Sequence, residues 1–194
     1  SWCLNMMTAK KLNFGNIMGH VTNVTNLASL ASWTADQFDP TLTWEDIAWI
    51  KDRWKGKLIL KGIMDSEDAM LAVKAGADAI IISNHGGRQL DGAPSTISVL
   101  PEIVDAVNSK VEVHFDGGVR SGQDVLKALA LGADCIHIGR PYVYGLGAKG
   151  QEGVEIAIEI IKKELDLTMA MCGETNISNV GLHNLHHNPF KIIN

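Results

Sequence analysis

Residues 79–92 read AIIISNHGGRQLDG, an apolar run followed directly by a loop that contains a histidine, two glycines and an arginine. A short run of branched apolar residues is typical of a buried strand. Histidine titrates near neutral pH, which suits His85 to proton transfer. Arg88 has a planar guanidinium that can bind a carboxylate through two parallel hydrogen bonds. The stretch therefore predicts a strand whose carboxyl end forms the rim of an active site.

The chain around this stretch alternates predicted strands with predicted helices. Ser66 is expected to cap one helix, and Gly76 to end it. Apolar strands separated by amphipathic helices favour a parallel sheet covered by helices, with right-handed crossovers. Strands are predicted at residues 57–63, 79–83, 111–115 and 135–138, and helices at residues 66–75, 97–107, 122–131 and about 142–171.

An internal repeat supports this alternation. KAGADAIII at residues 74–82 and ALGADCIHI at residues 130–138 match in phase, with Gly132 standing 56 positions after Gly76. The interval spans two strand-helix units, and a spacing of about 28 residues per unit is close to that of a (β/α)8 barrel. The predicted fold class is therefore α/β, a (β/α)8 TIM barrel of which this chain supplies four units.

Two turns rich in glycine and arginine follow the third and fourth predicted strands. They are DGGVR at residues 116–120 and GR at residues 139–140. Such turns at the start of a helix direct backbone N–H groups towards an anion, and the helix dipole adds to the attraction. Barrels of this kind commonly bind phosphate through the loops after strands seven and eight. The four strands are therefore expected to be the last four of the barrel.

Lys61 is a cationic residue between Leu60 and Gly62, inside the strand predicted at residues 57–63. It could extend its ammonium group from a surface position into solvent. At the carboxyl end of the strand it could instead stabilise negative charge that develops on a cofactor. The sequence leaves both interpretations open.

Composition limits the function classes. Of the 194 residues, 46% are hydrophobic and 20% are charged, which suits a globular domain with a real core. The net charge is −5, and the chain lacks the excess of basic residues that nucleic-acid binding requires, so nucleic acid is not expected as the main partner. No apolar run reaches the roughly 18 residues of a membrane span, and no signal-peptide pattern opens the sequence.

No metal site is predicted. An odd number of cysteines without metal-ligand spacing fits reduced thiols in the cytosol. The histidines near the carboxyl end lack a carboxylate or cysteine framework, so a solvated or packing tail is expected. The residues concerned are Cys3, Cys135, Cys172, His183, His186 and His187.

Three regions are expected along the chain. Residues 1–46 have no long periodicity and are interpreted as an irregular lid segment with one or two helices. Residues 47–173 form the half-barrel. An amphipathic helix is predicted at residues 43–55 and overlaps the start of this region. Residues 174–194 form a polar tail. The first residue is Ser1, so the polypeptide is expected to be cut, processed or partly observed.

The motifs resemble, in order and spacing, the FMN-dependent α-hydroxy-acid oxidases and dehydrogenases. This family includes glycolate oxidase, L-lactate oxidase, L-lactate dehydrogenase and mandelate dehydrogenase. The resemblance runs from about Trp33 to Gly173 and implies FMN as the cofactor. The matching stretches are LKGI at residues 60–63, SNHGGRQLDG at 83–92, DGGVRSG at 116–122 and GRP at 139–141.

The resemblance also implies roles for individual residues. Lys61 would lie against the N1 and C2 carbonyl edge of the flavin, and Ser83 would touch the isoalloxazine ring. His85 would be the catalytic base, and Arg88 would bind the substrate carboxylate. The FMN phosphate end would be held by Asp116, Gly117, Gly118, Arg120, Gly139 and Arg140.

The resemblance covers only the carboxyl-terminal half of the family's barrel. The first four strands have no counterpart here, nor do the active-site tyrosine and the aspartate that orients the histidine. Half a parallel barrel leaves open strand edges and an uncovered face. We therefore expect a longer polypeptide, in which the amino-terminal half of the barrel is a partner of this one. By family resemblance we also expect a homo-oligomer, a tetramer.

The predicted function is FMN-dependent oxidation of an L-2-hydroxy acid, lactate-like, to the 2-oxo acid. His85 would remove the hydroxyl proton while hydride passes to the flavin, or it would remove the α-proton. A cytoplasmic location is expected, with peripheral contact at the inner membrane face as an option. The alternatives are another FMN or phosphate-binding barrel, of the inosine monophosphate dehydrogenase type, and a non-catalytic half-barrel. Oxygen, a quinone and a cytochrome all remain open as electron acceptor.

Overall fold

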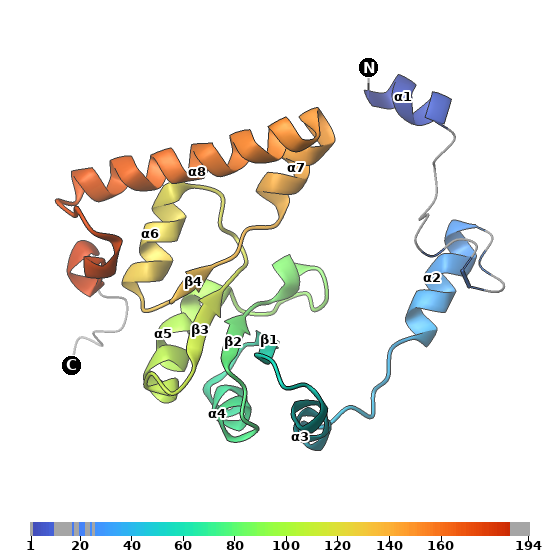
Figure 1. Ribbon diagram of the computed structural model, residues 1–194, viewed down its shortest axis with the longest axis horizontal. Helices are drawn as coiled ribbons and strands as arrows, with labels where there is room; N and C mark the ends of the chain where they lie inside the picture. The colour runs from blue at the N-terminus through green and yellow to red at the C-terminus, as the bar shows by residue number, and fades with distance from the viewer. Residues whose placement is uncertain (1, 10–16, 18–19, 22–23, 25, 187–194) are drawn as a thin grey trace. The chain divides into compact units, whose positions relative to one another are not determined.

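The chain divides into two compact units, residues 1–43 and residues 44–194. Its computed structural model describes residues 2–9, 17, 20, 21, 24 and 26–186 (Figure 1). The first unit contains helix α1 (Trp2–Ala9) and helix α2 (Leu27–Asp36). The Asn26 side chain caps α2 by accepting a hydrogen bond of 2.9 Å from the Ser29 backbone N–H. The expectation of one or two helices in this part of the chain agrees with these elements.

The second unit is a four-stranded sheet with helices packed along it. The strands follow the order β1-β2-β3-β4, and every neighbouring pair is parallel. Helices α4, α5 and α6 lie along one side of the sheet in Figure 1, which confirms the predicted alternation. The strands are β1 (Ile59–Ile63), β2 (Ala79–Ile82), β3 (Glu112–Phe115) and β4 (Cys135–Ile136). The helices are α3 (Trp44–Arg53), α4 (Ser66–Lys74), α5 (Thr96–Val107), α6 (Gly122–Ala130), α7 (Arg140–Lys149) and α8 (Gln151–Met171).

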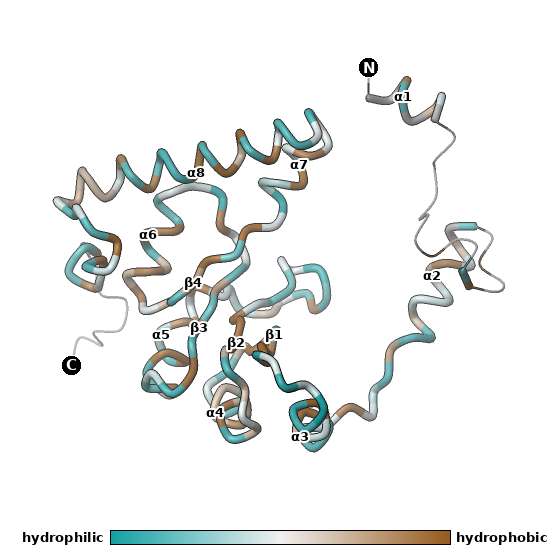
Figure 2. The backbone as a smooth tube through the Cα atoms, viewed as in Figure 1, coloured by the Kyte–Doolittle hydropathy of each residue, from teal (hydrophilic) through white to brown (hydrophobic). Residues whose placement is uncertain are grey.

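The two faces of the sheet differ because successive side chains of a strand point to opposite sides. Ile80 and Ile82 of β2 are fully buried and belong to one hydrophobic core with Leu100 and Ile103 of α5. Figure 2 shows hydrophobic residues concentrated in the strands, whereas residues alternate in hydropathy along α8. The opposite face carries a row of residues in register across the strands, namely Lys61, Ile81, His114 and Cys135. This row is the face that a closed barrel would enclose.

Two details differ from the sequence prediction. Ser66 is the first residue of α4, and the cap is Asp65, whose carboxylate accepts a hydrogen bond of 2.9 Å from the Asp68 backbone N–H. Both side chains can cap a helix, so the sequence alone does not choose between them. The helical stretch predicted at about residues 142–171 is two helices, α7 and α8, which meet at Gly150.

Helices α7 and α8 pack directly against each other at two glycines. A Cβ placed on Gly145 would overlap the carbonyl oxygen of Gly153, and one placed on Gly153 would overlap that of Gly145. The two backbones therefore touch, which only residues without a side chain permit. This contact fixes where α7 begins, at Arg140, relative to α8.

The described part of the tail folds back on itself. It contains two short 3₁₀ turns, at Ile177–Asn179 and Leu182–Asn184. The Glu174 carboxylate accepts a hydrogen bond of 2.9 Å from the Asn184 side chain and lies 2.8 Å from His183 Nε2. The expectation that the tail histidines lack a carboxylate is therefore wrong for His183, although the contact agrees with a packing role. His187 lies outside the described residues.

Four consecutive strand-helix units in parallel order, with helices on one face, make an arc like half of a (β/α)8 barrel. The loops after the strands all leave from the carboxyl edge of the sheet. No helix among the described residues combines the length and the apolar character that crossing a membrane requires.

Candidate active site

A cavity of about 560 Å³ lies at the carboxyl edge of the sheet. It gathers Lys61 from β1 and residues from the loops after the other three strands, which the parallel arrangement brings to one rim. All the predicted site residues except Ser83 line it, and Ser83 is 1% exposed in the layer beneath. The predicted residues in the lining are Lys61, His85, Arg88, Asp116, Gly117, Gly118, Arg120, Gly139 and Arg140.

Lys61, Ser83 and Asp116 form a polar network at the ends of three neighbouring strands. Lys61 Nζ lies 2.7 Å from Asp116 Oδ2 and donates a hydrogen bond of 2.5 Å to Ser83 Oγ. Ser83 Oγ donates in turn to Asp116 Oδ1, at 2.6 Å. The side chain of Lys61 is 44% exposed and that of Asp116 is 19% exposed. The ammonium group is thus held in place at the cavity wall, which argues against Lys61 as a lysine that merely reaches into solvent.

His85 occupies an unusual backbone conformation in the turn after β2. Its φ is +56°, in the left-handed region that residues other than glycine seldom adopt. The turn is held by Asn84, whose side-chain oxygen accepts a hydrogen bond of 3.1 Å from the Gly86 N–H. A Cβ on Gly62 would lie 3.3 Å from His85 Cε1, so the imidazole packs over a glycine of β1. Backbone strain of this kind is concentrated at functional sites.

The imidazole of His85 has no hydrogen-bond partner among the residues that the structure describes. Arg88 lies at the end of the same turn, where its Nε donates a hydrogen bond of 3.1 Å to the His85 carbonyl oxygen. This bond orients the guanidinium while its two terminal nitrogens remain available for a ligand. The pair can therefore provide a proton acceptor and an anion-binding fork side by side.

The first glycine turn is shaped by Thr96. Gly117 and Gly118 have φ angles of +95° and +87°, and a Cβ on Gly117 would lie only 2.8 Å from Thr96 Oγ1. The buried Thr96 hydroxyl donates a hydrogen bond of 3.2 Å to the Gly117 carbonyl oxygen. Glycine is required here on both counts. The turn therefore presents a concave stretch of backbone to the cavity.

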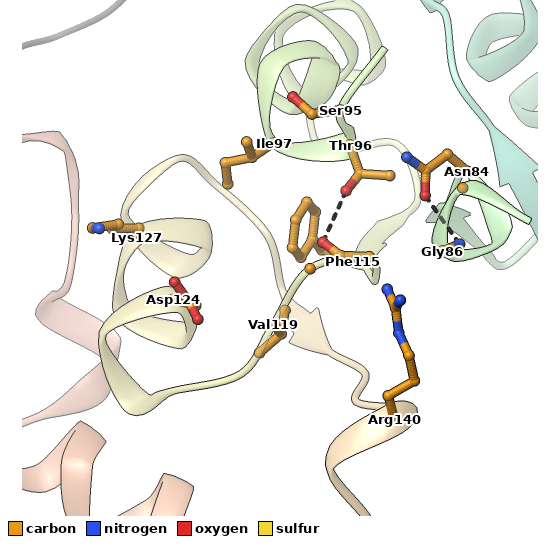
Figure 3. A pocket seen from close by; sticks show the side chains of 13 residues that line it. Asn84, Gly86, Ser95, Thr96, Ile97, Phe115, Val119, Asp124, Lys127 and Arg140 are labelled. Atoms are coloured by element: carbon orange, nitrogen blue, oxygen red, sulfur yellow. Dashed lines mark hydrogen bonds between the residues drawn. The ribbon is translucent and has the colours of Figure 1, made fainter. Parts of the chain in front are cut away.

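Arg140 comes from the second turn and points towards the first. It stands at the first position of α7, and its guanidinium approaches the Asn84–Gly86 turn (Figure 3). A Cβ on Gly86 would lie 3.5 Å from a terminal nitrogen of Arg140. A second cavity, of about 430 Å³, lies between these turns, and Arg140, Gly117 and Gly118 line both cavities. The arrangement favours an anion between them.

Arg120 adds a fourth cationic side chain to this rim. Its backbone N–H donates a hydrogen bond of 2.9 Å to Asp124, which together with Ser121 caps α6. The side chains of Arg120 and Arg140 have no hydrogen-bond or ion-pair partner within the described part of the chain. Unpaired guanidiniums beside glycine turns at helix N-termini match the chemistry of a phosphate group.

The sequence analysis missed Asn84 and Thr96, which shape the two turns, and a cluster of imidazoles on the sheet. His114 Nδ1 lies 3.1 Å from His137 Nε2, and His114 Nε2 lies 3.1 Å from Glu112 Oε2. Burial lowers the pKa of His137, and the neighbouring His114 acts in the same direction. Strand alternation places residues 135 and 137 on one face, but only the strand register brings residue 114 to them.

The fold and this rim define the class: an α/β barrel protein with its site at the carboxyl ends of the strands. Residues 2–187 match the family of FMN-dependent dehydrogenases, and the chain belongs to this family. The resemblance found in the sequence is thereby confirmed, and FMN is the cofactor of the family.

Individual relatives agree with this assignment. The chain is 42% identical over 186 residues to an L-lactate dehydrogenase of Vibrio cholerae, covering 95% of this chain and 49% of the relative. It is 48% identical over 182 residues to 2-hydroxyacid oxidase 1 of Mus musculus, covering 94% of this chain and 46% of the relative. The chain therefore spans about half the length of these curated relatives.

A solved structure shares the fold. The crystal structure of the monotopic membrane protein (S)-mandelate dehydrogenase superposes with a TM-score of 0.77 at 38% identity, covering 84% of this chain and 43% of that one. This likeness confirms the predicted fold class, a (β/α)8 barrel of which the chain supplies about the last four strand-helix units. The residues present fit FMN, because the glycine turns, Arg120 and Arg140 offer a cradle for a phosphate.

Proposed function

We propose that this chain carries the catalytic rim of an enzyme that oxidises an L-2-hydroxy acid, lactate-like, to the 2-oxo acid with FMN. The observation that carries the proposal is one cavity lined by His85, Arg88 and Lys61 together with two glycine turns and their arginines. Membership of the FMN-dependent dehydrogenases supports it, as do the names of the relatives, L-lactate dehydrogenase and 2-hydroxyacid oxidase.

The phosphate end of the cofactor is assigned to the two glycine turns. Gly117, Gly118 and Gly139 provide backbone N–H groups, and Arg120 and Arg140 provide positive charge. Asp116 anchors the start of the first turn through its contacts with Lys61 and Ser83. Arg140 approaches the Asn84–Gly86 turn, so the phosphate site and the histidine loop are neighbours.

The ring end is assigned to Lys61 and Ser83. FMN supplies a two-electron acceptor for the oxidation. The ammonium group of Lys61, fixed by Asp116 and Ser83, would stabilise negative charge on the flavin ring. The preorganised position matters because the protein does not have to rearrange its dipoles during the reaction.

His85 and Arg88 are assigned to the substrate. Arg88 binds the carboxylate through its terminal nitrogens, which orients the α-carbon towards the cofactor. In becoming a 2-oxo acid, the substrate loses two electrons and two protons. His85 accepts one of these protons, either from the hydroxyl group or from the α-carbon, and FMN would take up the two electrons and the other proton. The imidazole, unpaired within the described residues, is free to take it.

We further propose that four more strand-helix units complete the barrel. The sheet described here ends at β1 and β4, and the curated relatives are about twice as long as the matched region. By family resemblance we propose a homotetramer. Intact mass and light scattering of the purified protein test both points, and a lone 21.0 kDa monomer that turns over substrate would contradict them.

For location we propose the cytoplasm, with peripheral contact at the inner membrane face. The reduced-thiol composition supports the first part, and the solved (S)-mandelate dehydrogenase, a monotopic membrane protein, supports the second. Fractionation of cells tests the proposal, because a peripheral protein is released from membranes by high salt whereas a cytoplasmic one needs no release.

The experiment that tests the function is anaerobic reduction of the bound flavin. Protein loaded with FMN is mixed with L-lactate, and the visible flavin absorbance is followed. We expect bleaching with L-lactate and none with D-lactate at the same concentration. Flavin that binds but is reduced by no 2-hydroxy acid would leave a binding protein only, and failure to bind FMN would remove the proposal altogether.

A further inference from the structure

A second cluster of side chains lies on the uncovered face of the sheet. His114 of β3 is paired in register with Cys135 of β4, and His137 follows two residues later on the same face. The two imidazole rings lie with their centroids 5.2 Å apart and their planes at 38°. The ligand atoms of His114, Cys135 and His137 all lie within 4.8 Å of one another.

The hydrogen bonds of His114 fix which of its nitrogens carries the proton. Glu112 Oε2 lies 3.1 Å from His114 Nε2, and a carboxylate only accepts, so Nε2–H is the donor. In the neutral ring Nδ1 is then an acceptor, and His137 Nε2–H donates a hydrogen bond of 3.1 Å to it. When His137 changes tautomer, both nitrogens present a lone pair to the space between the rings. A carboxylate that orients an imidazole from its far nitrogen is the usual support of a histidine metal ligand.

The spacing of the ligand atoms suits a tetrahedral ion. Two nitrogens bound to one zinc at about 2.0–2.1 Å stand roughly 3.3 Å apart, close to the 3.1 Å between His114 Nδ1 and His137 Nε2. A zinc-bound thiolate would need Cys135 Sγ to approach by an adjustment on the order of 1 Å. His114 is 8% exposed, and Cys135 and His137 are half-buried. His137 lines the cavity at the carboxyl edge of the sheet, which gives an ion a path to the ligands.

We propose that His114 Nδ1, His137 Nε2 and Cys135 Sγ bind a zinc ion, with a fourth position open to water. Two imidazoles and a thiolate are the donors that zinc prefers over magnesium or calcium. Binding releases one proton, because the thiol must become a thiolate. His137 also lines the cavity of about 560 Å³, so the ion would lie next to the proposed flavin site. None of the three ligands has a role in the flavin chemistry proposed above.

Two features of the cluster make the proposal specific. His114 and Cys135 are paired in register on adjacent strands. His137 directly follows β4, where its backbone N–H donates a hydrogen bond of 2.8 Å to the Phe115 carbonyl oxygen, so all three backbone positions are held. Glu112 adds a second test, since loss of a carboxylate behind a ligand weakens metal binding by about 10- to 100-fold without removing a ligand.

The experiment uses the full chain, loaded with FMN, and the metal alone as the probe. Zinc content after dialysis against micromolar Zn²⁺ is measured by elemental analysis, and Co²⁺ is titrated as a spectroscopic substitute. We expect one ion per chain and tetrahedral Co²⁺ bands at wavelengths longer than the flavin absorbs, with a thiolate charge-transfer band. Zn²⁺ should displace Co²⁺. No bound zinc and no cobalt spectrum would overturn the proposal.

Variants locate the ion. Cys135→Ser should remove the charge-transfer band, His137→Gln should weaken binding by at least about 100-fold, and Glu112→Gln by about 10- to 100-fold. The matched controls are Cys172→Ser and His183→Gln, which change an exposed thiol and a tail histidine. If metal binding is unchanged in Cys135→Ser and His137→Gln but is lost in His183→Gln, the ion lies on the tail and the assignment is overturned.

A measurement on the unaltered protein covers the case in which a variant does not fold. Cys135 and Cys172 are both free thiols, the second of them exposed. Zn²⁺ should slow alkylation of Cys135, measured by peptide mapping, and leave alkylation of Cys172 unchanged. Equal rates for Cys135 with and without Zn²⁺ would contradict the proposal.

Discussion

The two ends of the sheet use polar residues in opposite ways. At the amino ends, Asp78 and Asp134 stand at matching places in the internal repeat. Asp78 accepts a hydrogen bond of 2.9 Å from the Leu58 N–H, and Asp134 accepts one of 2.8 Å from the Val113 N–H. Each aspartate also donates its own N–H to the carbonyl oxygen of the same partner residue, at 2.8 Å. These carboxylates join β1 to β2 and β3 to β4 at their amino ends.

At the carboxyl ends the loops fix the positions of the polar residues, but several of their side chains have no partner among the described residues. His85 keeps a free imidazole among the described residues, and Arg120 and Arg140 keep free guanidiniums. His85 and the glycine turns adopt left-handed backbone there, as Asn108 and Ser109 do at the amino edge. The difference teaches that one edge of a barrel fixes the fold and the other holds the chemistry.

The largest effect is expected for His85→Gln. Loss of the proton acceptor should lower the rate of flavin reduction by L-lactate by about 10²- to 10⁴-fold, measured by stopped-flow absorbance. FMN affinity, measured by fluorescence, should stay the same because the phosphate turns are untouched. A rate within a few-fold of the unaltered protein would remove His85 from its role.

Arg88→Gln comes next. Two charge-assisted hydrogen bonds to the substrate carboxylate are lost, at about 1.5–2 kcal/mol each, so kcat/KM should fall by about 10²- to 10³-fold. Arg88→Lys should recover only part, since an ammonium group lacks the planar fork. Arg53, which stacks on Trp49 at 4.2 Å, offers a control. Equal losses in Arg53→Gln would point to a general effect of charge.

Gly117→Ala tests the shape of the phosphate turn. A methyl group would stand 2.8 Å from Thr96 Oγ1, with φ at +95°, and the strain is expected to be about 1–3 kcal/mol. FMN should bind about 5- to 100-fold more weakly. The matched control is Gly118→Ala, whose φ is +87° but whose Cβ meets nothing within 4 Å. Equal weakening in both variants would contradict a role for Thr96.

Asp134→Ala tests the opposite edge. The Val113 N–H loses its carboxylate acceptor, so the free energy of unfolding should fall by about 1–2 kcal/mol. Urea unfolding measures this change. The folded fraction should bind FMN as tightly as before, because no cavity residue has moved. A loss of FMN affinity without a loss of stability would reverse the assignment of the two edges.

The smallest effect is expected from pH at Asp78. Hydrogen bonds from Lys51, Lys57 and Leu58 hold the pKa of its carboxyl well below the usual value. The unfolded chain then binds more protons, so this contribution is complete above the ordinary aspartate pKa of about 4 and is lost as pH falls below it. The test is the melting temperature, measured at pH values from roughly 6 down to roughly 3, which span this range. The melting temperature should fall less steeply with decreasing pH in Asp78→Asn than in the unaltered protein. Identical pH profiles would contradict the argument.

Much of the architecture could be predicted from the sequence because parallel strands are continuous apolar runs and helices have caps and stops. The rim could be predicted as well, since glycine, histidine and arginine directly after a strand have few structural explanations. Details that depend on competing local partners could not: Asp65 and Ser66 can both cap α4, and only packing selects Asp65. The cluster of His114, Cys135 and His137 could not be predicted either, because the register between β3 and β4 brings these residues together and sequence spacing does not reveal it.

The contact between Gly145 and Gly153 makes α8 a rigid support for the helix that begins at the proposed phosphate site. Arg140 begins the helix that Gly145 holds, so main-chain contacts set the backbone position from which the guanidinium extends. The outward surface of α8 can vary freely without disturbing that position. A methyl group added at Gly145 or Gly153 would push α7 and α8 apart. Arg140 would then move away from the anion, although neither glycine touches the anion site.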